Sequence, residues 1–264
     1  MTGLLLSLSA VASLVPAGFM RADERPAGGV AWALLAVAIA GPAVWLVDNV
    51  GGGWRTGLAP ALWLAILSSM VAFAGLVVVE RGAARLAPLL VGYLVWLGFL
   101  ATIWEHAPER PLVGAAPEGW LVAHILVAVF AYGLLTLAAV AGLAVFLQER
   151  ALRAKRPTEF TRRLPSVAEG EALLARLLMA SGTVLGLALL SGSSLSWFTA
   201  HRFVVFDHKT VLSFATFVAI GVLLIVHSRG GLSGRRAARY VLFAYLLLTL
   251  AYPGVKFVTD VLMG

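Results

Sequence analysis

The sequence contains no cysteine and few charged residues. Only 12% of its 264 residues are charged, whereas 61% are hydrophobic. Without cysteine the chain can form no disulfide and no thiolate metal site, and it cannot hold a cofactor through a thioether bond. A soluble domain of this length could not hide so much apolar surface, because surface area falls too slowly with size. The composition therefore excludes an ordinary soluble protein.

Long apolar runs account for most of the chain. Runs of about 20 apolar residues match a hydrocarbon core of roughly 30 Å. The first run has no basic residue before it, so we interpret it as a retained helix and not as a cleaved signal. The sequence predicts an all-α polytopic membrane protein, one transmembrane domain over residues 1–264. About eight transmembrane helices are expected, approximately at 2–20, 28–48, 58–79, 86–104, 119–147, 173–196, 211–227 and 240–262.

The distribution of Lys and Arg predicts the orientation of these helices. Fourteen of the 20 basic residues lie in the odd-numbered connections and four in the even-numbered ones. Since basic loops remain in the cytoplasm, both ends of the chain are expected outside it. The net charge of +7 then reflects topology and contacts with anionic lipid headgroups, and no nucleic-acid partner is expected. Residues 148–172, rich in Arg and Glu, are expected to form an amphipathic surface connector.

Polar side chains within apolar runs are costly in a bilayer and commonly mark a functional site. In the run at 211–227, Ser213, Thr216 and His227 fall within about 40° of one another around a helix, which predicts one polar stripe. His227 lies at the cytoplasmic end of this stripe. The alternative is a histidine at the level of the lipid headgroups.

His124 lies four residues after Trp120, which is expected to anchor the fifth helix at the outer interface. The imidazole would lie about 6 Å deeper than Trp120, and Tyr132 two turns deeper again. A histidine surrounded by apolar residues in this way is a candidate to coordinate a bound cofactor. The alternative is a structural histidine bonded to a neighbouring helix.

The last apolar run aligns polar residues on one face, and Pro253-Gly254 should interrupt the helix. The aligned residues are Tyr245, Thr249, Tyr252, Lys256 and Asp260. Lys256 either extends to the outer interface or pairs with a carboxylate of a ligand.

Two histidines, His201 and His208, lie near aromatic residues in the preceding outer connection. They would suit a flat, apolar, metal-containing ligand, or belong to an aromatic belt at the interface. In the sixth run, Ser181, Gly182 and Gly186 predict a close contact between helices.

No catalytic motif is present. The sequence lacks GxSxG, a Walker loop and HExxH, and its carboxylates lie mostly in loops beside Arg. We therefore expect no enzyme activity.

The second half of the chain holds, in order, the segments Trp120-Leu-Val-Ala-His124, Phe130-Ala-Tyr132-Gly133, Phe146-Leu-Gln-Glu-Arg150, Asp207-His-Lys209, Ser213-Phe214, His227-Ser-Arg229, Arg235-Arg236-Ala-Ala-Arg239 and Leu250-Ala-Tyr252-Pro-Gly-Val255. Their order and spacing resemble the cytochrome c assembly family of CcsA/CcmC-type heme-handling membrane proteins, in its eight-helix YpjD/HemX-like branch. The resemblance covers roughly residues 119–264, whereas the first four helices match only in number and hydropathy.

The resemblance implies a heme-binding protein of the bacterial inner membrane that handles or exports heme for cytochrome c assembly, with other assembly factors as partners. His124 corresponds to an outward-facing heme ligand of the family, and His227 to a histidine inside the membrane. Both are therefore expected ligands of heme iron, at two depths of a transfer route. The implied ligand is non-covalent heme b. From their own positions in the helices, and not from the resemblance, Tyr132, Trp120 and Lys256 are further candidates to contact it. The family's tryptophan-rich WWD segment and its second outer histidine after the last helix are absent here. We suggest His208 or His201 as a substitute partner, which the resemblance itself does not imply. The alternatives are a transporter for another solute and a non-catalytic membrane subunit.

Overall fold

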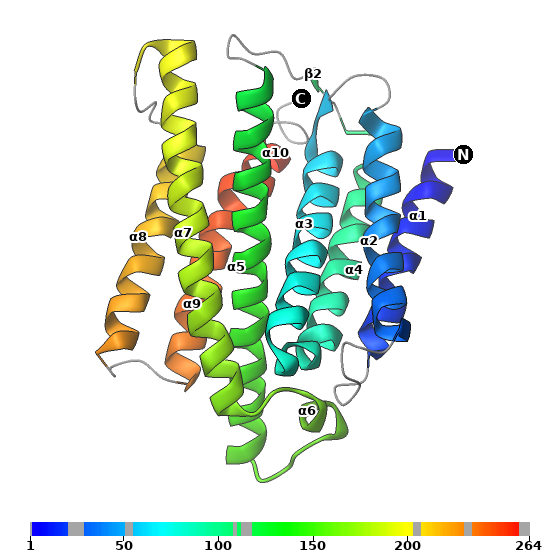
Figure 1. Cartoon of the computed structure of the whole chain (residues 1–264), viewed down its shortest axis with the longest axis vertical. Coiled ribbons are helices and arrows are strands. Elements are labelled where there is room, and N and C mark those ends of the chain that lie inside the picture. The colour runs from blue at the N-terminus through cyan, green and yellow to red at the C-terminus, as the bar shows by residue number, and fades with distance from the viewer. Residues whose placement is uncertain are drawn as a thin grey trace.

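The structure, a computed structural model, consists of long helices packed side by side (Figure 1). It describes residues 2–20, 29–50, 55–107, 110–111, 118–202, 207–229 and 234–258. The prediction of an all-α membrane protein is confirmed, with one short antiparallel pair of strands in addition. The elements are α1 (Thr2–Leu14), a 3₁₀ turn (Val15–Phe19), α2 (Gly29–Val50), β1 (Arg55–Thr56), α3 (Leu58–Val79), a 3₁₀ segment (Arg81–Leu86), α4 (Ala87–Ile103), β2 (Arg110–Pro111), α5 (Glu118–Arg153), α6 (Glu159–Arg163), α7 (Val167–Ala200), α8 (His208–Ser228), α9 (Gly234–Thr249), a π-helical turn (Leu250–Gly254) and α10 (Val255–Phe257).

Within these residues, seven helical segments are long and apolar enough to cross a membrane, and Gly3–Phe19 is a shorter apolar helix. Together they correspond to the eight predicted runs, so the chain is a multi-pass membrane protein. The first segment packs into the bundle: Leu14 and Ala17 are fully buried. The buried hydroxyl of Ser7 accepts from Nε1 of Trp45 at 2.8 Å and donates to Glu105 at 3.2 Å, which joins α1 to α2 and to the turn after α4.

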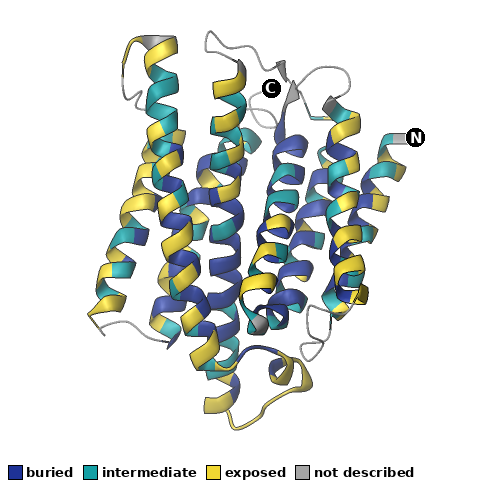
Figure 2. Ribbon diagram, in the orientation of Figure 1, coloured by how far each residue is buried: buried dark blue, intermediate teal, exposed yellow. Residues whose placement is uncertain are grey.

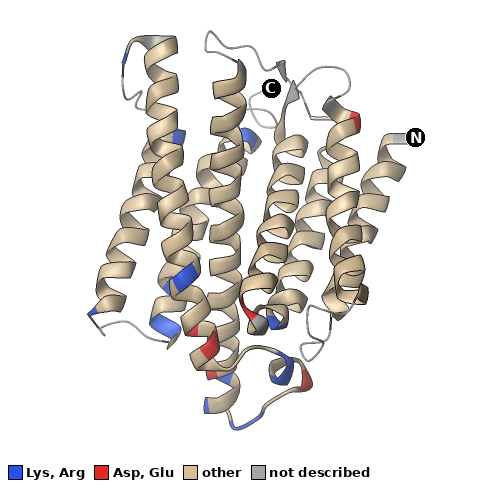
Figure 3. Ribbon diagram, in the orientation of Figure 1, with Lys and Arg blue, Asp and Glu red and all other residues tan. Residues whose placement is uncertain are grey.

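The two ends of the bundle differ in charge. Basic residues gather at the end that carries α6, here called the basic end, whereas the start of α1 and the short α10 lie at the opposite end (Figures 1 and 3). The described helix ends that flank the odd-numbered connections share this end, while residues 21–28 and 230–233 lie outside the described part of the chain. That this end faces the cytoplasm stays a prediction from the charge count. The elements at this end carry Arg85 before α4, Arg150 and Arg153 at the end of α5, Lys155 and Arg156 after it, Arg162 and Arg163 in α6, Arg229 after α8, and Arg235, Arg236 and Arg239 in α9.

The predicted connector at 148–172 is shorter in the structure. Helix α5 continues to Arg153 and α7 already begins at Val167, because Arg and Glu are good helix formers once the chain leaves the membrane. Thr158 caps α6 and Ser166 caps α7, each through a reciprocal capping box. Only residues 154–166 therefore lie between the two long helices.

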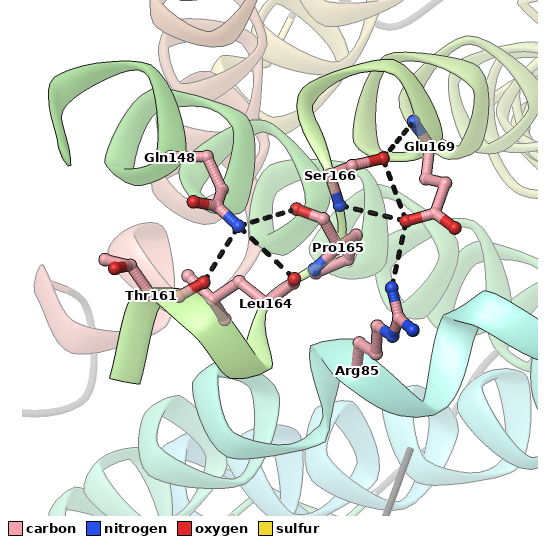
Figure 4. A network of polar contacts seen from close by, with 7 residues as sticks. All are labelled: Arg85, Gln148, Thr161, Leu164, Pro165, Ser166 and Glu169. Atoms are coloured by element: carbon pink, nitrogen blue, oxygen red, sulfur yellow. Dashed lines mark hydrogen bonds and ion pairs between the residues drawn. The ribbon is translucent and has the colours of Figure 1, made fainter. Parts of the chain in front are cut away.

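Side-chain bonds hold this connector against the bundle (Figure 4). Nε2 of Gln148 donates to the backbone oxygens of Thr161 at 2.8 Å, Pro165 at 3.1 Å and Leu164 at 3.3 Å. Next to it, Arg85 donates to Glu169 at 3.2 Å, which ties the connection before α4 to the start of α7. At the basic end, these polar contacts thus connect the first half of the chain to the second.

Helix α5 is the centre of the bundle and packs against α3, α7 and α9. Its middle is buried on nearly all sides, whereas the outer faces of α2, α7 and α8 are exposed (Figure 2). In lipid the hydrophobic effect does not drive helices together, so their association depends mainly on close van der Waals packing. A Cβ on Gly133 would lie 2.9 Å from the backbone carbon of Ser68, so glycine lets α3 and α5 touch. The predicted close contact through Gly182 and Gly186 is also present, against Ile220 and Phe217 of α8.

Candidate functional site

A largely apolar cavity lies between α3, α5, α7, α8 and the segment that ends in α10. Its volume is about 390 Å³, within the range of roughly 300–1,000 Å³ that is typical of small-molecule sites. It lies toward the end opposite the basic end, because its lining includes the starts of α3 and α8 and the end of the last helical segment. The lining comprises Gly57, Pro60, Ala61, Leu64, Leu121, His124, Ile125, Ala128, Val129, Tyr132, Leu185, Ala188, Leu189, Lys209, Ser213, Leu248, Ala251, Tyr252 and Lys256.

One face of α5 forms a wall of this cavity. Its lining residues occur at 121, 124, 125, 128, 129 and 132, the spacing of a single helical stripe. Two of the six, His124 and Tyr132, carry polar groups. The helical period alone therefore brings the predicted ligand and the tyrosine two turns deeper to the same wall.

The imidazole of His124 rests on α7. Its Nδ1 lies 2.9 Å from Oγ of Ser191, and a Cβ on Gly192 would lie only 3.0 Å from its Cε1. Ser191 thus supplies a hydrogen bond, and Gly192 supplies the space for the ring. The Gly-Ser end of this helix, which is poor in large side chains, explains why α7 can approach the histidine so closely.

The hydrogen bonds of Ser191 define the tautomer of His124. Oγ of Ser191 also lies 3.0 Å from the backbone oxygen of Ala188, to which it donates its one proton. It must then accept from Nδ1–H of His124 for both bonds to form. This leaves the lone pair on Nε2, the arrangement in which a neutral imidazole can ligate a metal.

Hydroxyl groups from three helices meet beside the cavity. Tyr245 of α9 lies 2.6 Å from Tyr93 of α4, 3.0 Å from Tyr132 and 3.2 Å from Thr136, measured between side-chain oxygens. Thr249 lies 3.3 Å from the hydroxyl of Tyr132. Because each polar group has a partner, the cluster is tolerated deep in the bundle and ties α4, α5 and α9 together.

A sequence model of the family described as Cytochrome C assembly protein matches residues 56–263. The chain belongs to the cytochrome c assembly protein family.

This family match begins at α3, earlier than the resemblance over residues 119–264, so α3 and α4 belong to the family region as well. A relative from Azospirillum brasilense is 49% identical over 264 residues, which cover 98% of this chain and 97% of the relative. That protein is described as an uncharacterized 28.8 kDa protein in the nifR3-like 5'region. No solved structure matches the chain.

The structure brings three predicted residues of this family member, His124, Tyr132 and Lys256, to one cavity. It places other candidates elsewhere. Trp120 is exposed one turn before His124 on α5 and does not line the cavity. His208 is exposed at the start of α8, and His201 is exposed at the end of α7, where its ring lies 6.0 Å from that of Trp197. Neither histidine is among the lining residues.

His227 lies at the basic end, far along α8 from the cavity. Its side chain is exposed, and it borders only a gap of about 10 Å³ between α7, α8 and α9. The three residues of the predicted polar stripe on α8 therefore do not share one site. Ser213 lines the cavity, whereas Thr216 is fully buried and donates to the backbone of Leu212 at 2.8 Å. The role of His227 as a second heme ligand stays a prediction.

Four of the five aligned polar residues of the last run lie in the described part of the chain, and Asp260 lies outside it. Tyr252 and Lys256 line the cavity, while Tyr245 and Thr249 join the hydroxyl cluster. A π-helical turn with Pro253 interrupts the regular helix at the predicted break.

Four site residues were not recognised as such from the sequence: Ser191, Gly192, Lys209 and Tyr93. Small residues at the end of an apolar run were the only signal for the first two. Lys209 was counted as a loop charge, and Tyr93 is a single hydroxyl in an apolar run. Their roles depend on contacts with residues 60 or more positions away, except for Lys209, whose role depends on where α8 begins.

Proposed function

We propose that this protein binds heme in the cavity, with Nε2 of His124 as an iron ligand, and handles it for cytochrome c assembly. Membership of the cytochrome c assembly family supports involvement in cytochrome c biogenesis. The observation that carries the heme proposal is the orientation of His124 by Ser191 and Gly192 beside an apolar cavity. We further propose that the membrane is the inner membrane of a bacterium, where such assembly takes place.

The donor set fits this group. Neutral imidazole is a common axial ligand of heme iron, and its other nitrogen is usually bonded to a fixed acceptor. Here that acceptor is Ser191, while Leu121, Ile125 and Leu189 offer apolar contacts to a porphyrin face. Bound heme would supply an iron centre and a conjugated ring. The residues of this chain hold the ring, orient the imidazole and limit access of water.

The first experiment measures heme binding. The full-length chain is purified in nonionic detergent and titrated with heme, and the Soret band is followed. We expect binding by the wild-type chain and by His208→Ala, the matched control, and at least a tenfold loss in His124→Ala. Added imidazole should restore the band in His124→Ala, because it can enter the space that the side chain leaves. No Soret band with the wild-type chain, or a band unchanged in His124→Ala, would refute heme binding at this site.

A second experiment tests the cellular role. In a host that depends on this protein, its deletion should reduce covalently bound c-type cytochrome. The wild-type chain should restore the cytochrome and His124→Ala should not, at equal membrane abundance. If His124→Ala restored the c-type cytochrome fully, the role in assembly would not depend on His124 in this cavity.

A second candidate function is transport of another solute. It is favoured by the π-helical turn at Leu250–Gly254, since interrupted helices often border transport sites and Ala251 of this turn lines the cavity. Solute flux in liposomes that persists in His124→Ala would support transport over heme handling.

A further inference from the structure

The charged groups at the cavity are all of one sign. Among the described residues that line it, Lys209 and Lys256 carry the only formal charges at neutral pH, and none is Asp or Glu. The remaining lining is mostly aliphatic. A ligand that fills this cavity therefore meets apolar contacts over most of its surface and two ammonium groups at particular points.

The two lysines come from different helices at the same end of the bundle. Lys209 lies in the first turn of α8, which Asp207 fixes by accepting from the backbone N–H of Thr210 at 2.7 Å. Lys256 lies in α10, directly after the turn that contains Pro253. Lys209 is exposed and Lys256 is half-buried, so both ammonium groups can reach the boundary between the cavity and the membrane surface.

Resting on the heme-binding function proposed above, we propose that Lys209 and Lys256 form the carboxylate-recognition part of this site. The ligand they select carries carboxylates along one edge and an apolar face elsewhere, as the propionate edge of heme does. This edge would lie toward the end opposite the basic end, while the apolar ring lies deeper, beside His124. A carboxylate near the apolar region is costly without a cationic partner, and a charge-assisted hydrogen bond from each lysine removes that cost.

The proposal makes the pair a determinant of specificity. Heme dimethyl ester has the same ring and iron but no carboxylate charge, so it should gain nothing from either lysine. Hydrogen bonds to charged groups contribute enough to change affinity by roughly tenfold or more each. The wild-type chain is therefore expected to prefer heme over its dimethyl ester by at least about tenfold.

The experiment titrates the full-length chain in nonionic detergent with heme and, separately, with heme dimethyl ester. The double variant that combines Lys209→Gln and Lys256→Gln should bind heme more weakly, with an affinity close to that for the ester. Its affinity for the ester should equal that of the wild-type chain. Unchanged ester binding also reports that the variant is folded. Lys209→Arg with Lys256→Arg should keep the preference, and Lys155→Gln on the connector of the basic end is the matched control.

Two results would overturn the proposal: equal affinity of the wild-type chain for both ligands, or a preference that persists in the double Gln variant. The proposal would also be overturned if the double Gln variant bound neither heme nor the ester and the double Arg variant did not restore the binding of heme. A repeat with phosphatidylglycerol in the micelles addresses anionic lipid as the partner of these lysines. If lipid is the partner of the lysines, the ratio of the affinities for heme and for the ester stays the same in all variants, which contradicts the proposal. The heme-binding function itself fails in a different way, when neither ligand gives a Soret band that depends on His124.

Discussion

The hydrogen bond between Ser191 and His124 offers a sharp test of how the site is organised. Ser191→Ala removes the group that accepts from Nδ1–H, while the apolar lining, the volume of the cavity and the histidine itself remain. The imidazole is then free to rotate and to take the other tautomer, which presents N–H instead of a lone pair to the cavity. Loss of such a partner of a metal-ligating histidine typically lowers metal affinity about 10- to 100-fold, or about 1.4–2.8 kcal/mol.

The assay is a heme titration of the purified chain, together with the position of the Soret band and the electron paramagnetic resonance of the ferric form. The matched control is Ser193→Ala, because the hydroxyl of Ser193 donates at 3.0 Å to the backbone of Leu189, within its own helix. We expect weaker binding and altered spectra in Ser191→Ala and neither change in Ser193→Ala. Wild-type affinity and spectra in Ser191→Ala, with binding lost in His124→Ala, would refute the role assigned to Ser191.

Three further predictions concern the fold. Tyr245→Phe removes the hydroxyl that bonds Tyr93, Tyr132 and Thr136, of which Tyr132 and Thr136 keep a second bond each. It should destabilise the chain by about 1–3 kcal/mol in detergent unfolding, whereas Tyr240→Phe, exposed on the same helix, should have little effect. Gln148→Leu removes three hydrogen bonds from the connector and should accelerate tryptic cleavage between α5 and α7 roughly tenfold. Because the chain has no cysteine, a membrane-impermeant maleimide should label Arg202→Cys in intact cells and label Arg156→Cys only after lysis.

Each of these has a result that contradicts it. Equal stability of Tyr245→Phe and Tyr240→Phe would mean that the hydroxyl cluster contributes nothing. Unchanged proteolysis of Gln148→Leu would mean that other contacts hold the connector. Labelling of Arg156→Cys in intact cells would reverse the orientation predicted from the charges.

The sequence predicted the membrane architecture because lipid imposes simple requirements on it. Apolar length identifies a spanning helix, and the distribution of Lys and Arg identifies the connections that share one end. The helical period placed Tyr252 and Lys256 on one face, and Pro253 predicted the interruption of the last helix. Helix ends were less predictable, because α5 and α7 continue past the membrane through charged residues that are themselves good helix formers.

By itself, the sequence determined an all-helical membrane bundle and the connections that share one end, and it named His124 and His227 as candidate heme ligands. Only the tertiary structure decided that His124 faces a cavity while His227 lies exposed at the basic end. It also decided that Ser191 orients the ring and that Lys209 joins Lys256. The physical reason is that spans and faces follow from periods within one helix. A cavity, in contrast, depends on which helices pack together, and this is set by small residues such as Gly133, Gly182 and Gly192 acting across long separations in the chain.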